Sequence, residues 1–271
     1  MSPLDGVPAP SDTPALVEAR GLTKDSPCEG GTTRVVEDVS FAIQPGETVG
    51  LVGESGSGKS TVARMLLRLI EPTAGDVMFE GQPLPPASSS AMRALRRRMQ
   101  IVFQDPYAAL NPRMTVGKIL AEPFAIHSEA PREGLPARLR ELLRSVGLDE
   151  SALPRYPHEF SGGQRQRINI ARALALQPSF LVLDEPVSAL DVSVGAQVIN
   201  LLRDLQRTMG LTYLFISHSM PLVRYLCDRV AVMQRGRLVE LGDCLQVCEA
   251  PQNPYTRQLI AATPEMPAAT N

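Results

Sequence analysis

The 271-residue sequence lacks the features that mark secreted or generally basic proteins. Its cysteines, at positions 28, 227, 244 and 248, are sparse and unevenly spaced, which favours a reducing cytosol over a disulfide framework. No second pair completes a metal site with Cys244 and Cys248, so we expect no structural metal. The net charge of −2 argues against a generally basic nucleic-acid binder.

Long apolar runs are also missing. No run approaches the roughly 18 residues that a membrane-spanning helix needs. The start, MSPLDGVPAPSDTP, has neither a basic segment nor an apolar core, which excludes a secretory signal and predicts a disordered, Pro-rich lead-in. Because 44% of the residues are hydrophobic, the chain has enough apolar material for one large α/β domain with an inserted subdomain.

A glycine-rich loop stands out against this background. GESGSGKS, residues 53–60, fits the pattern G-x4-G-K-[S/T]. Glycines at 53, 56 and 58 let the backbone turn tightly and bring its N–H groups close to phosphate oxygens. Lys59 would reach the β- and γ-phosphates of a nucleoside triphosphate, and the Ser60 hydroxyl would help to hold Mg²⁺.

The residues around this loop support a phosphate site over a surface glycine turn. TVGLV, residues 48–52, is a short β-branched run that predicts a strand buried on both faces. After the loop, apolar residues recur at helical spacing, namely Val62, Met65, Leu66, Leu69 and Ile70. Strand, loop and helix therefore follow in the order that phosphate binding requires.

Two later segments predict the rest of a phosphate and magnesium site. Phe180 to Leu183 reads as a buried strand ending in Asp184 and Glu185, where a metal finds oxygen ligands and an attacking water finds a base. Ser161 would cap a helix that opens with two glycines and runs to about Leu176.

One histidine differs from the other two. His218 follows the predicted strand 213–216, on the same sheet edge as Asp184, whereas His127 and His158 are typical of structural or solvated histidines.

The remaining segments predict a second, mainly helical lobe inserted into a β-rich part. We expect strands at 15–20, 39–43, 76–80 and 100–103, a loop at 24–33, a linker at 81–90, helices at 136–148 and 194–205, and a hairpin of 230–233 with 238–241. The basic run MRALRRR, residues 92–98, would place Met92, Leu95 and Met99 on one helical face. We interpret its charges as a solvated face, with nucleic-acid or lipid contact as the alternative.

Taken together, these motifs resemble those of the ATP-binding subunits of ABC transporters, over about residues 15–263. The resemblance identifies GESGSGKST, residues 53–61, as the Walker A loop, Gln104 as the Q-loop glutamine, and SGGQRQR from Ser161 as the signature. FLVLDE would be the Walker B strand, SALD with Asp191 the D-loop, and His218 the switch histidine. This implies a P-loop NTPase with a mixed, mainly parallel core sheet, an antiparallel β part and a helical subdomain.

Finer features resemble the peptide/nickel importer group. They are VFQDPYAALNPRMTV, YPHEFSGGQRQR and the ending EAPQNPYTRQLIAATP. The resemblance implies a peripheral subunit on the cytoplasmic face of the inner membrane. Its partners would be two permease subunits, a second ATP-binding subunit in a homo- or heterodimer and, indirectly, an extracytoplasmic solute-binding protein. Di- and oligopeptides are the favoured cargo, with nickel or a metal chelate as the alternative.

The resemblance also assigns roles. ATP would bind to Gly53, Glu54, Ser55, Gly56, Ser57, Gly58, Lys59, Ser60 and Thr61. Mg²⁺ would be held by Ser60, Gln104 and Asp184, and catalysis would use Glu185, His218, Gln104 and Lys59. Ser161, Gly162, Gly163 and Gln164 would meet the ATP of the partner subunit, and Asp191 would link the two sites.

Three departures from the family pattern affect the prediction. The sequence ends at Asn271, without the cysteine-bearing extension of longer members, so we expect no iron–sulfur cluster. Residues 21–40 contain no aromatic side chain to stack on adenine, and an aliphatic contact such as Val35 would replace it. Ser219 stands where the family commonly has Asp.

Other classes remain as alternatives. One is an ABC-type ATPase that acts on nucleic acid or the ribosome, and another is a small-molecule kinase that shares only the P-loop. The stretch 58–161 has neither the heptads nor the Cys pairs of DNA-repair ATPases, and we expect no nucleic-acid partner. The predicted organisation is a lead-in at 1–14, an ATPase domain at 15–262 with a helical subdomain at about 87–175, and a tail at 263–271.

Overall fold

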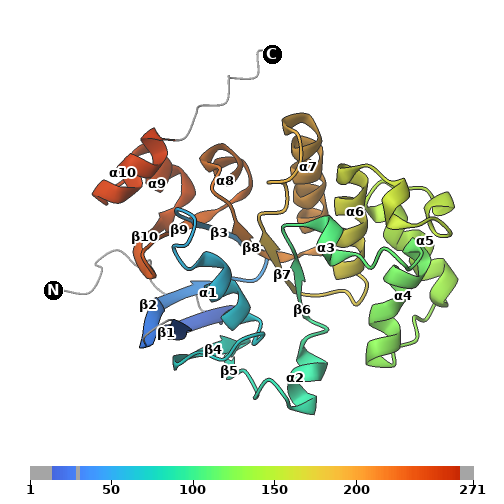
Figure 1. Cartoon of the computed structure of the whole chain (residues 1–271), viewed down its shortest axis with the longest axis horizontal. Coiled ribbons are helices and arrows are strands. Elements are labelled where there is room, and N and C mark those ends of the chain that lie inside the picture. Colours follow the sequence, from blue (N-terminus) through green and yellow to red (C-terminus); the bar gives the residue numbers. More distant parts are fainter. Residues whose placement is uncertain (1–13, 29–30, 263–271) are drawn as a thin grey trace. The chain divides into compact units, whose positions relative to one another are not determined.

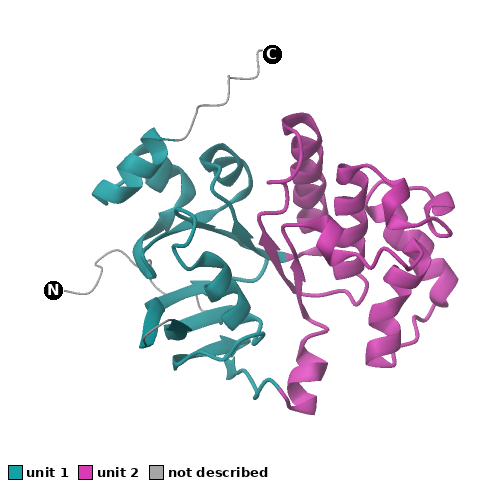
Figure 2. Cartoon of the chain, viewed as in Figure 1, with its two compact units in different colours: residues 1–87, 212–271 teal, residues 88–211 magenta. Residues whose placement is uncertain are grey.

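The computed structural model describes residues 14–28 and 31–262, which fall into two compact units. Figure 2 colours them separately: one unit contains residues 1–87 and 212–271, and the other contains residues 88–211. The predicted lead-in and tail lie outside the described residues, apart from Pro14. No helix within the described ranges combines the length and the apolar character needed to cross a bilayer.

An antiparallel sheet forms one layer of the first unit, in the order β2-β1-β4-β5. Its strands are β1 (Val17–Cys28), β2 (Gly31–Ile43), β4 (Ala74–Phe79) and β5 (Gln82–Pro83). The predicted loop at 24–33 is wrong, because β1 continues to Cys28 and β2 begins at Gly31. The two strands pair along their whole length, although the register of their pairing shifts at three points between Ala19 and Asp25.

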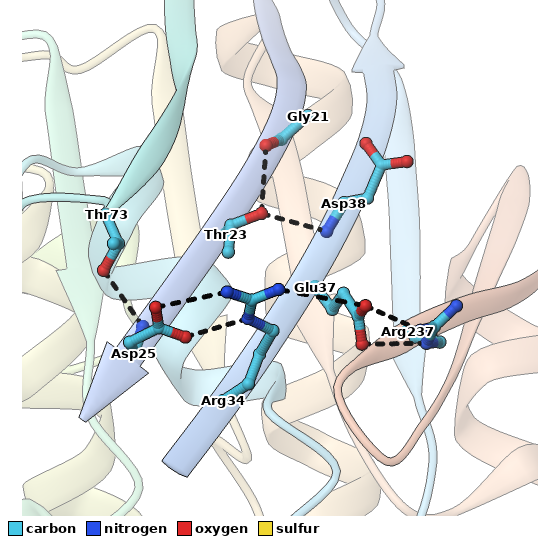
Figure 3. Close-up of polar contacts among 8 residues, drawn as sticks. All are labelled: Gly21, Thr23, Asp25, Arg34, Glu37, Asp38, Thr73 and Arg237. Atoms are coloured by element: carbon cyan, nitrogen blue, oxygen red, sulfur yellow. Dashed lines mark hydrogen bonds and ion pairs between the residues drawn. The ribbon is translucent and has the colours of Figure 1, made fainter. Parts of the chain in front are cut away.

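Polar side chains explain how this composition forms strands instead of a loop. Figure 3 shows a chain of ion pairs across the strands, in which the Arg34 Nε donates to Asp25 at 2.9 Å and Arg237 of β10 donates to Glu37 at 2.6 to 3.0 Å. The Asp25 backbone N–H donates to the Thr73 hydroxyl, which ties β1 to the segment before β4. The hydrogen bond from Arg34 lowers the pKa of Asp25. Cross-strand charge pairs of this kind favour strand pairing.

A second sheet of the same unit carries the glycine-rich loop (Figure 1). Its order is β10-β9-β3-β8, with β3 (Thr48–Val52) parallel to β8 (Thr212–Ile216) and β9 (Arg229–Gln234), and β10 (Arg237–Asp243) antiparallel to β9. All five residues of β3 are buried, as a continuous apolar strand requires. The predicted hairpin is therefore confirmed as β9 and β10.

Helices complete this unit. They are α1 (Lys59–Leu66), α8 (Met220–Leu226), α9 (Cys244–Glu249) and α10 (Pro254–Ala261). The prediction that Leu69 and Ile70 continue the helical face is wrong, because α1 ends at Leu66 and Leu69 is 46% exposed. Arg68 adopts a left-handed backbone, and Pro72 follows shortly after, which together stop the helix.

The second unit pairs two parallel strands with a group of helices. β6 (Met99–Val102) lies beside β7 (Phe180–Asp184). The helices are α2 (Ser90–Leu95), α3 (Pro106–Ala109), α4 (Val116–His127), α5 (Leu135–Ser145), α6 (Gly162–Ala173) and α7 (Val192–Met209). Placing Met99 on a helical face is wrong, because α2 ends at Leu95 and Met99 pairs with Phe180. With parallel strands in both units and one antiparallel sheet, the predicted fold class is confirmed.

Candidate functional site

The loop between β3 and α1 wraps around the Lys59 ammonium group. The Lys59 Nζ donates to the carbonyl oxygens of Gly53 at 2.7 Å and Glu54 at 2.8 Å, and the Lys59 side chain is buried. Glu54, Ser55 and Gly56 are exposed, Ser57 and Gly58 are buried, and Ser60 and Thr61 are half-buried in the first turn of α1. The loop therefore places a cation and the start of a helix together, as anion binding requires.

Two loop glycines are required by close backbone contacts. Gly53 has a φ of 146°, and a Cβ at this position would lie 2.2 Å from the Met233 carbonyl oxygen. Gly58 has a φ of 102°, and its Cβ would lie 3.0 Å from the Val35 carbonyl oxygen. Any other residue would strain the backbone at both positions; its Cβ would collide with β9 at position 53 and crowd β2 at position 58. β2 and the end of β9 thus fix the shape of the loop.

A tyrosine from the far end of the chain holds the tip of the loop. The Glu54 backbone N–H donates to the Tyr255 hydroxyl at 3.1 Å, and Tyr255 of α10 is buried. Asn253 caps α10 by accepting from the Tyr255 N–H, which fixes the start of the helix. The sequence prediction treated NPYTRQLI only as a group signature and missed this contact, because the two residues are 201 positions apart.

His218 follows β8 at the same edge of the sheet as the loop. Leu51 pairs with Ile216 in the parallel register, so the residues after β3 and after β8 leave the sheet side by side. The His218 side chain is exposed, whereas Ser217 is buried and its hydroxyl accepts from the Ser219 N–H at 3.0 Å. Within this unit, His218, the predicted switch histidine, and the loop therefore share one edge of the sheet.

In the second unit, the ends of β6 and β7 bring together two of the predicted catalytic residues. The Gln104 Nε2 donates to the Glu185 Oε2 at 3.2 Å. Val102 pairs with Leu183, so both side chains emerge from the carboxyl ends of adjacent parallel strands. Asp184 is 8% exposed, and the Glu185 side chain lies farther out.

The backbone of Glu185 is held in an unusual conformation. Its φ is 46°, in the left-handed region that L residues rarely adopt. The backbone N–H and hydroxyl of Ser188 both donate to the Glu185 carbonyl oxygen, at 3.2 and 3.1 Å, and Pro186 follows directly. Strain of this kind, about 1–3 kcal/mol, persists where neighbouring contacts fix a functional side chain.

The predicted signature opens α6 with a reciprocal cap. The Ser161 hydroxyl accepts from the Gln164 N–H, and the Gln164 side chain accepts from the Ser161 N–H. Gly163 also has a packing role, because a Cβ there would lie 2.2 Å from the Val194 Cγ1 on α7. The prediction attributed both glycines to anion binding and missed this contact.

Polar side chains on one face of α6, of which Gln166 and Asn169 are buried, tie this helix to the loops that follow β6 and β7. The Gln166 Nε2 donates to the Pro186 carbonyl oxygen at 2.8 Å, and the Asn169 Nδ2 donates to the Phe103 carbonyl oxygen at 3.5 Å. Arg172, one turn farther, reaches the Ala109 carbonyl oxygen at 2.5 Å. The helical spacing of these three polar residues in QRQRINIAR was the available signal, and the sequence prediction passed over it.

Asp191 forms the N-terminal cap of α7. Its carboxylate accepts from the Val194 N–H at 3.0 Å and from the Ser193 hydroxyl at 2.9 Å. These hydrogen bonds lower the pKa of Asp191. The predicted link to a second subunit is a separate role that this capping contact neither requires nor excludes.

Comparison with curated proteins finds relatives over nearly the whole chain. One relative is a Brucella ovis protein with the provisional name of peptide import ATP-binding protein. It is 54% identical to this chain, and the alignment covers 94% of this chain and 80% of that protein. The oligopeptide transport ATP-binding protein OppF of Bacillus subtilis is 51% identical, with 93% of this chain and 83% of that protein covered. GsiA of Shigella flexneri, a glutathione import ATP-binding protein, is 52% identical, with 93% of this chain and 42% of that protein covered.

Solved structures show the same architecture. CbiO1 of Clostridium perfringens, described as part of the ABC transporter complex cbiONQ, superposes with a TM-score of 0.77 at 28% identity, covering 88% of this chain and 92% of that one. MJ0796, a cassette solved as a dimer bound to ADP and phosphate, gives a TM-score of 0.75 at 28% identity, covering 84% and 98%. The family model described as "ABC transporter" matches residues 36–188. This chain therefore belongs to the ABC transporter family and has the fold of its ATPase cassettes.

Proposed function

We propose that this chain is the ATP-hydrolysing subunit that energises an importer of di- and oligopeptides. The observation that carries the proposal is a sequence identity of 51–54%, over 93–94% of the chain, to proteins named for peptide or oligopeptide import. The positions of the residues that we assign to hydrolysis support the proposal, since Gln104 donates a hydrogen bond to Glu185 and His218 shares a sheet edge with the phosphate loop.

In this proposal the phosphate loop binds ATP, and the carboxylates at the end of β7, Asp184 and Glu185, take part in its hydrolysis. Lys59 exchanges its contacts with the Gly53 and Glu54 carbonyl oxygens for the β- and γ-phosphates. Glu185 polarises the attacking water, and His218 orients the water and the γ-phosphate. Val35, half-buried beside Gly58, offers adenine an aliphatic contact in place of an aromatic ring.

Ser60, Gln104 and Asp184 would hold Mg²⁺. Their hydroxyl, amide and carboxylate oxygens match the oxygen ligands that this ion prefers, and Asp184 is nearly buried at the end of β7. The ion would neutralise charge on the β- and γ-phosphates.

A second subunit would complete the site. Ser161, Gly162, Gly163 and Gln164 would face the γ-phosphate bound by a partner, through a helix start whose backbone N–H groups attract anions. MJ0796, at 28% identity, was solved as a dimer, which supports such pairing. The partner is a second copy or a similar ATP-binding subunit.

The remaining partners would be membrane proteins. We propose that the chain docks on two permease subunits at the cytoplasmic face of the inner membrane, with an extracytoplasmic solute-binding protein delivering the cargo. The permease contact would lie near Gln104 to Arg113, where Tyr107 is 61% exposed and its ring packs under the Arg165 guanidinium at 4.0 Å. Substitutions of the exposed residues from Tyr107 to Arg113, which exclude Gln104, should uncouple transport while leaving basal hydrolysis in place.

Uptake by the native organism tests the cargo. Cells lacking this gene are complemented with the wild type or with Glu185→Gln, and uptake of a labelled tripeptide and of nickel is measured. We expect tripeptide uptake with the wild type alone. Restoration of nickel uptake without tripeptide uptake would contradict the peptide assignment and favour the metal-chelate alternative.

A further inference from the structure

Three cysteines gather behind the strand that carries the phosphate loop. Cys227 follows α8, and Cys244 and Cys248 lie one turn apart on α9. All three are free thiols in the structure. The Cys227 Sγ lies 3.0 Å from the position of a Cβ on Gly50, in the middle of β3. None of these thiols has a role in the proposed hydrolysis of ATP.

The thiols of Cys244 and Cys248 are paired. They share a side-chain hydrogen bond, and the Cys244 Sγ also lies 3.6 Å from the Val223 carbonyl oxygen on α8. Cys244 is 2% exposed, whereas Cys248 is half-buried and reachable from solvent. Four residues along a helix separate Cα atoms by about 6 Å, within the range that disulfides span. Their Cβ atoms lie about 5–6 Å apart, farther than a disulfide allows, so the bond closes only if the last turn of α9, which ends one residue after Cys248, opens.

The charges around the pair distinguish its members. The hydrogen bond from Cys244 and the charge of Arg224 lower the pKa of Cys248, whereas its burial and the charges of Glu249 and Asp243 oppose this shift. The same hydrogen bond and burial raise the pKa of Cys244. Cys248 is therefore the more acidic thiol of the pair, and Cys244 keeps its proton more firmly. Within the parts of the chain that the structure describes, no three His, Cys, Asp or Glu side chains are placed to hold a metal ion.

We propose that Cys248 and Cys244 form an oxidation site at which a hydroperoxide converts the two thiols to a disulfide. The Cys248 thiolate attacks the peroxide oxygen, forming an S–O bond and breaking the O–O bond, and the departing hydroxide or alkoxide takes up a proton. Cys244 then attacks the sulfur of the sulfenic acid, forming the S–S bond and releasing water. Two thiols are oxidised by two electrons, and one peroxide is reduced.

The second step is favoured by the first. The largest cause of the raised pKa of Cys244 is its hydrogen bond to Cys248. Once Cys248 is a neutral sulfenic acid, that contribution is gone, and Cys244 loses a proton more readily. Cys248 can approach because it lies in the last turn of α9, before Ala250, where the backbone leaves the helix.

Mass spectrometry of the full chain tests the site. The reduced protein is treated with hydrogen peroxide, the remaining thiols are alkylated, and peptides are mapped. We expect the peptide with Cys244 and Cys248 to lose two hydrogen atoms while exposed Cys28 is still recovered as an alkylated thiol. Oxidation of Cys28 before Cys248, or sulfinic acid at Cys248 with Cys244 still alkylated, would overturn the proposal.

Two variants assign the order of the steps. Cys244→Ala should leave a sulfenic acid on Cys248 that a cyclic 1,3-diketone traps, and Cys248→Ala should leave Cys244 unoxidised. Cys28→Ser is the matched control and should form the disulfide like the wild type. Because Cys244→Ala could destabilise the fold, alkylation rates are also compared in the unmodified chain, where Cys248 should react several-fold faster than Cys244. Equal rates at the two thiols would contradict the assignment of Cys248.

Discussion

At the scale of single residues, the account depends on Glu185. The residue is held in a left-handed backbone conformation by Ser188, and its carboxylate accepts a hydrogen bond from Gln104. A strained residue at the end of a buried strand, next to an amide, is typical of a side chain placed for chemistry.

Replacing Glu185 with Gln should preserve ATP binding and abolish turnover. The amide keeps the size of the side chain but cannot polarise water, so phosphate release should fall by about 10²- to 10⁴-fold. With ATP and Mg²⁺, size-exclusion chromatography should show a stable dimer. Exposed Glu133 provides the control, since Glu133→Gln should leave turnover unchanged. A monomer with undiminished turnover would show that Glu185 is not the catalytic carboxylate.

The contact between Tyr255 and the phosphate loop makes a second prediction. Tyr255→Phe removes only the hydroxyl that accepts from the Glu54 N–H, so the loop should lose part of its preorganisation. We expect KM for ATP to rise by about 2- to 10-fold, the equivalent of one hydrogen bond, with kcat little changed. Steady-state kinetics measure both constants, and Tyr225→Phe at an exposed tyrosine is the control. A fall in kcat with constant KM would place Tyr255 in the chemical step instead.

At the scale of elements, the packing of α6 against α7 explains a glycine of the signature. A Cβ on Gly163 would lie 2.2 Å from the Val194 Cγ1, and valine in a helix has little rotamer freedom. Gly162 has more room, since its Cβ would lie 3.3 Å from the Leu190 Cδ2. The packing of α6 against α7 therefore requires glycine at position 163 whether or not nucleotide is bound.

Gly163→Ala should lower the free energy of unfolding by about 1–3 kcal/mol through overpacking. The double variant Gly163→Ala, Val194→Ala should regain much of this loss, because the second change removes the colliding methyl group. Gly162→Ala is the matched control, with a smaller effect. Urea denaturation without nucleotide measures all four proteins. Equal losses in the single and double variants would contradict the packing explanation.

Elements with strong local signals were predictable from the sequence, and those that depend on distant partners were not. Both ends of the buried strand 48–52 were predicted correctly, because a continuous apolar run that leads into a glycine-rich loop indicates a buried strand that ends at the loop. The extended ends of β1 and β2 were missed, since their Gly, Ser, Thr and Pro composition suggests a loop until Arg34 and Asp25 pair across them. The helical spacing of Gln166 and Asn169 could have indicated a shared polar face, but their partners could not be predicted, because these are backbone carbonyls from other segments.

At the scale of the whole molecule, the chain is two units, and the residues that we propose to act in hydrolysis are divided between them. The phosphate loop and His218 lie in one unit, and Gln104, Glu185 and the signature lie in the other. The family comparison assigns the fold, and the relatives named for peptide import supply the proposed cargo. Association with membranes then depends on partner proteins in this account.

Co-purification from gently solubilised membranes tests this account most directly. The tagged chain is recovered from its native organism, and the proteins bound to it are identified by mass spectrometry. The account predicts two permease subunits, an ATP-binding subunit as partner and a solute-binding protein that binds peptides. Recovery of ribosomal or nucleoid proteins in place of permeases would contradict the transport function and favour an ATPase that acts on nucleic acid or the ribosome.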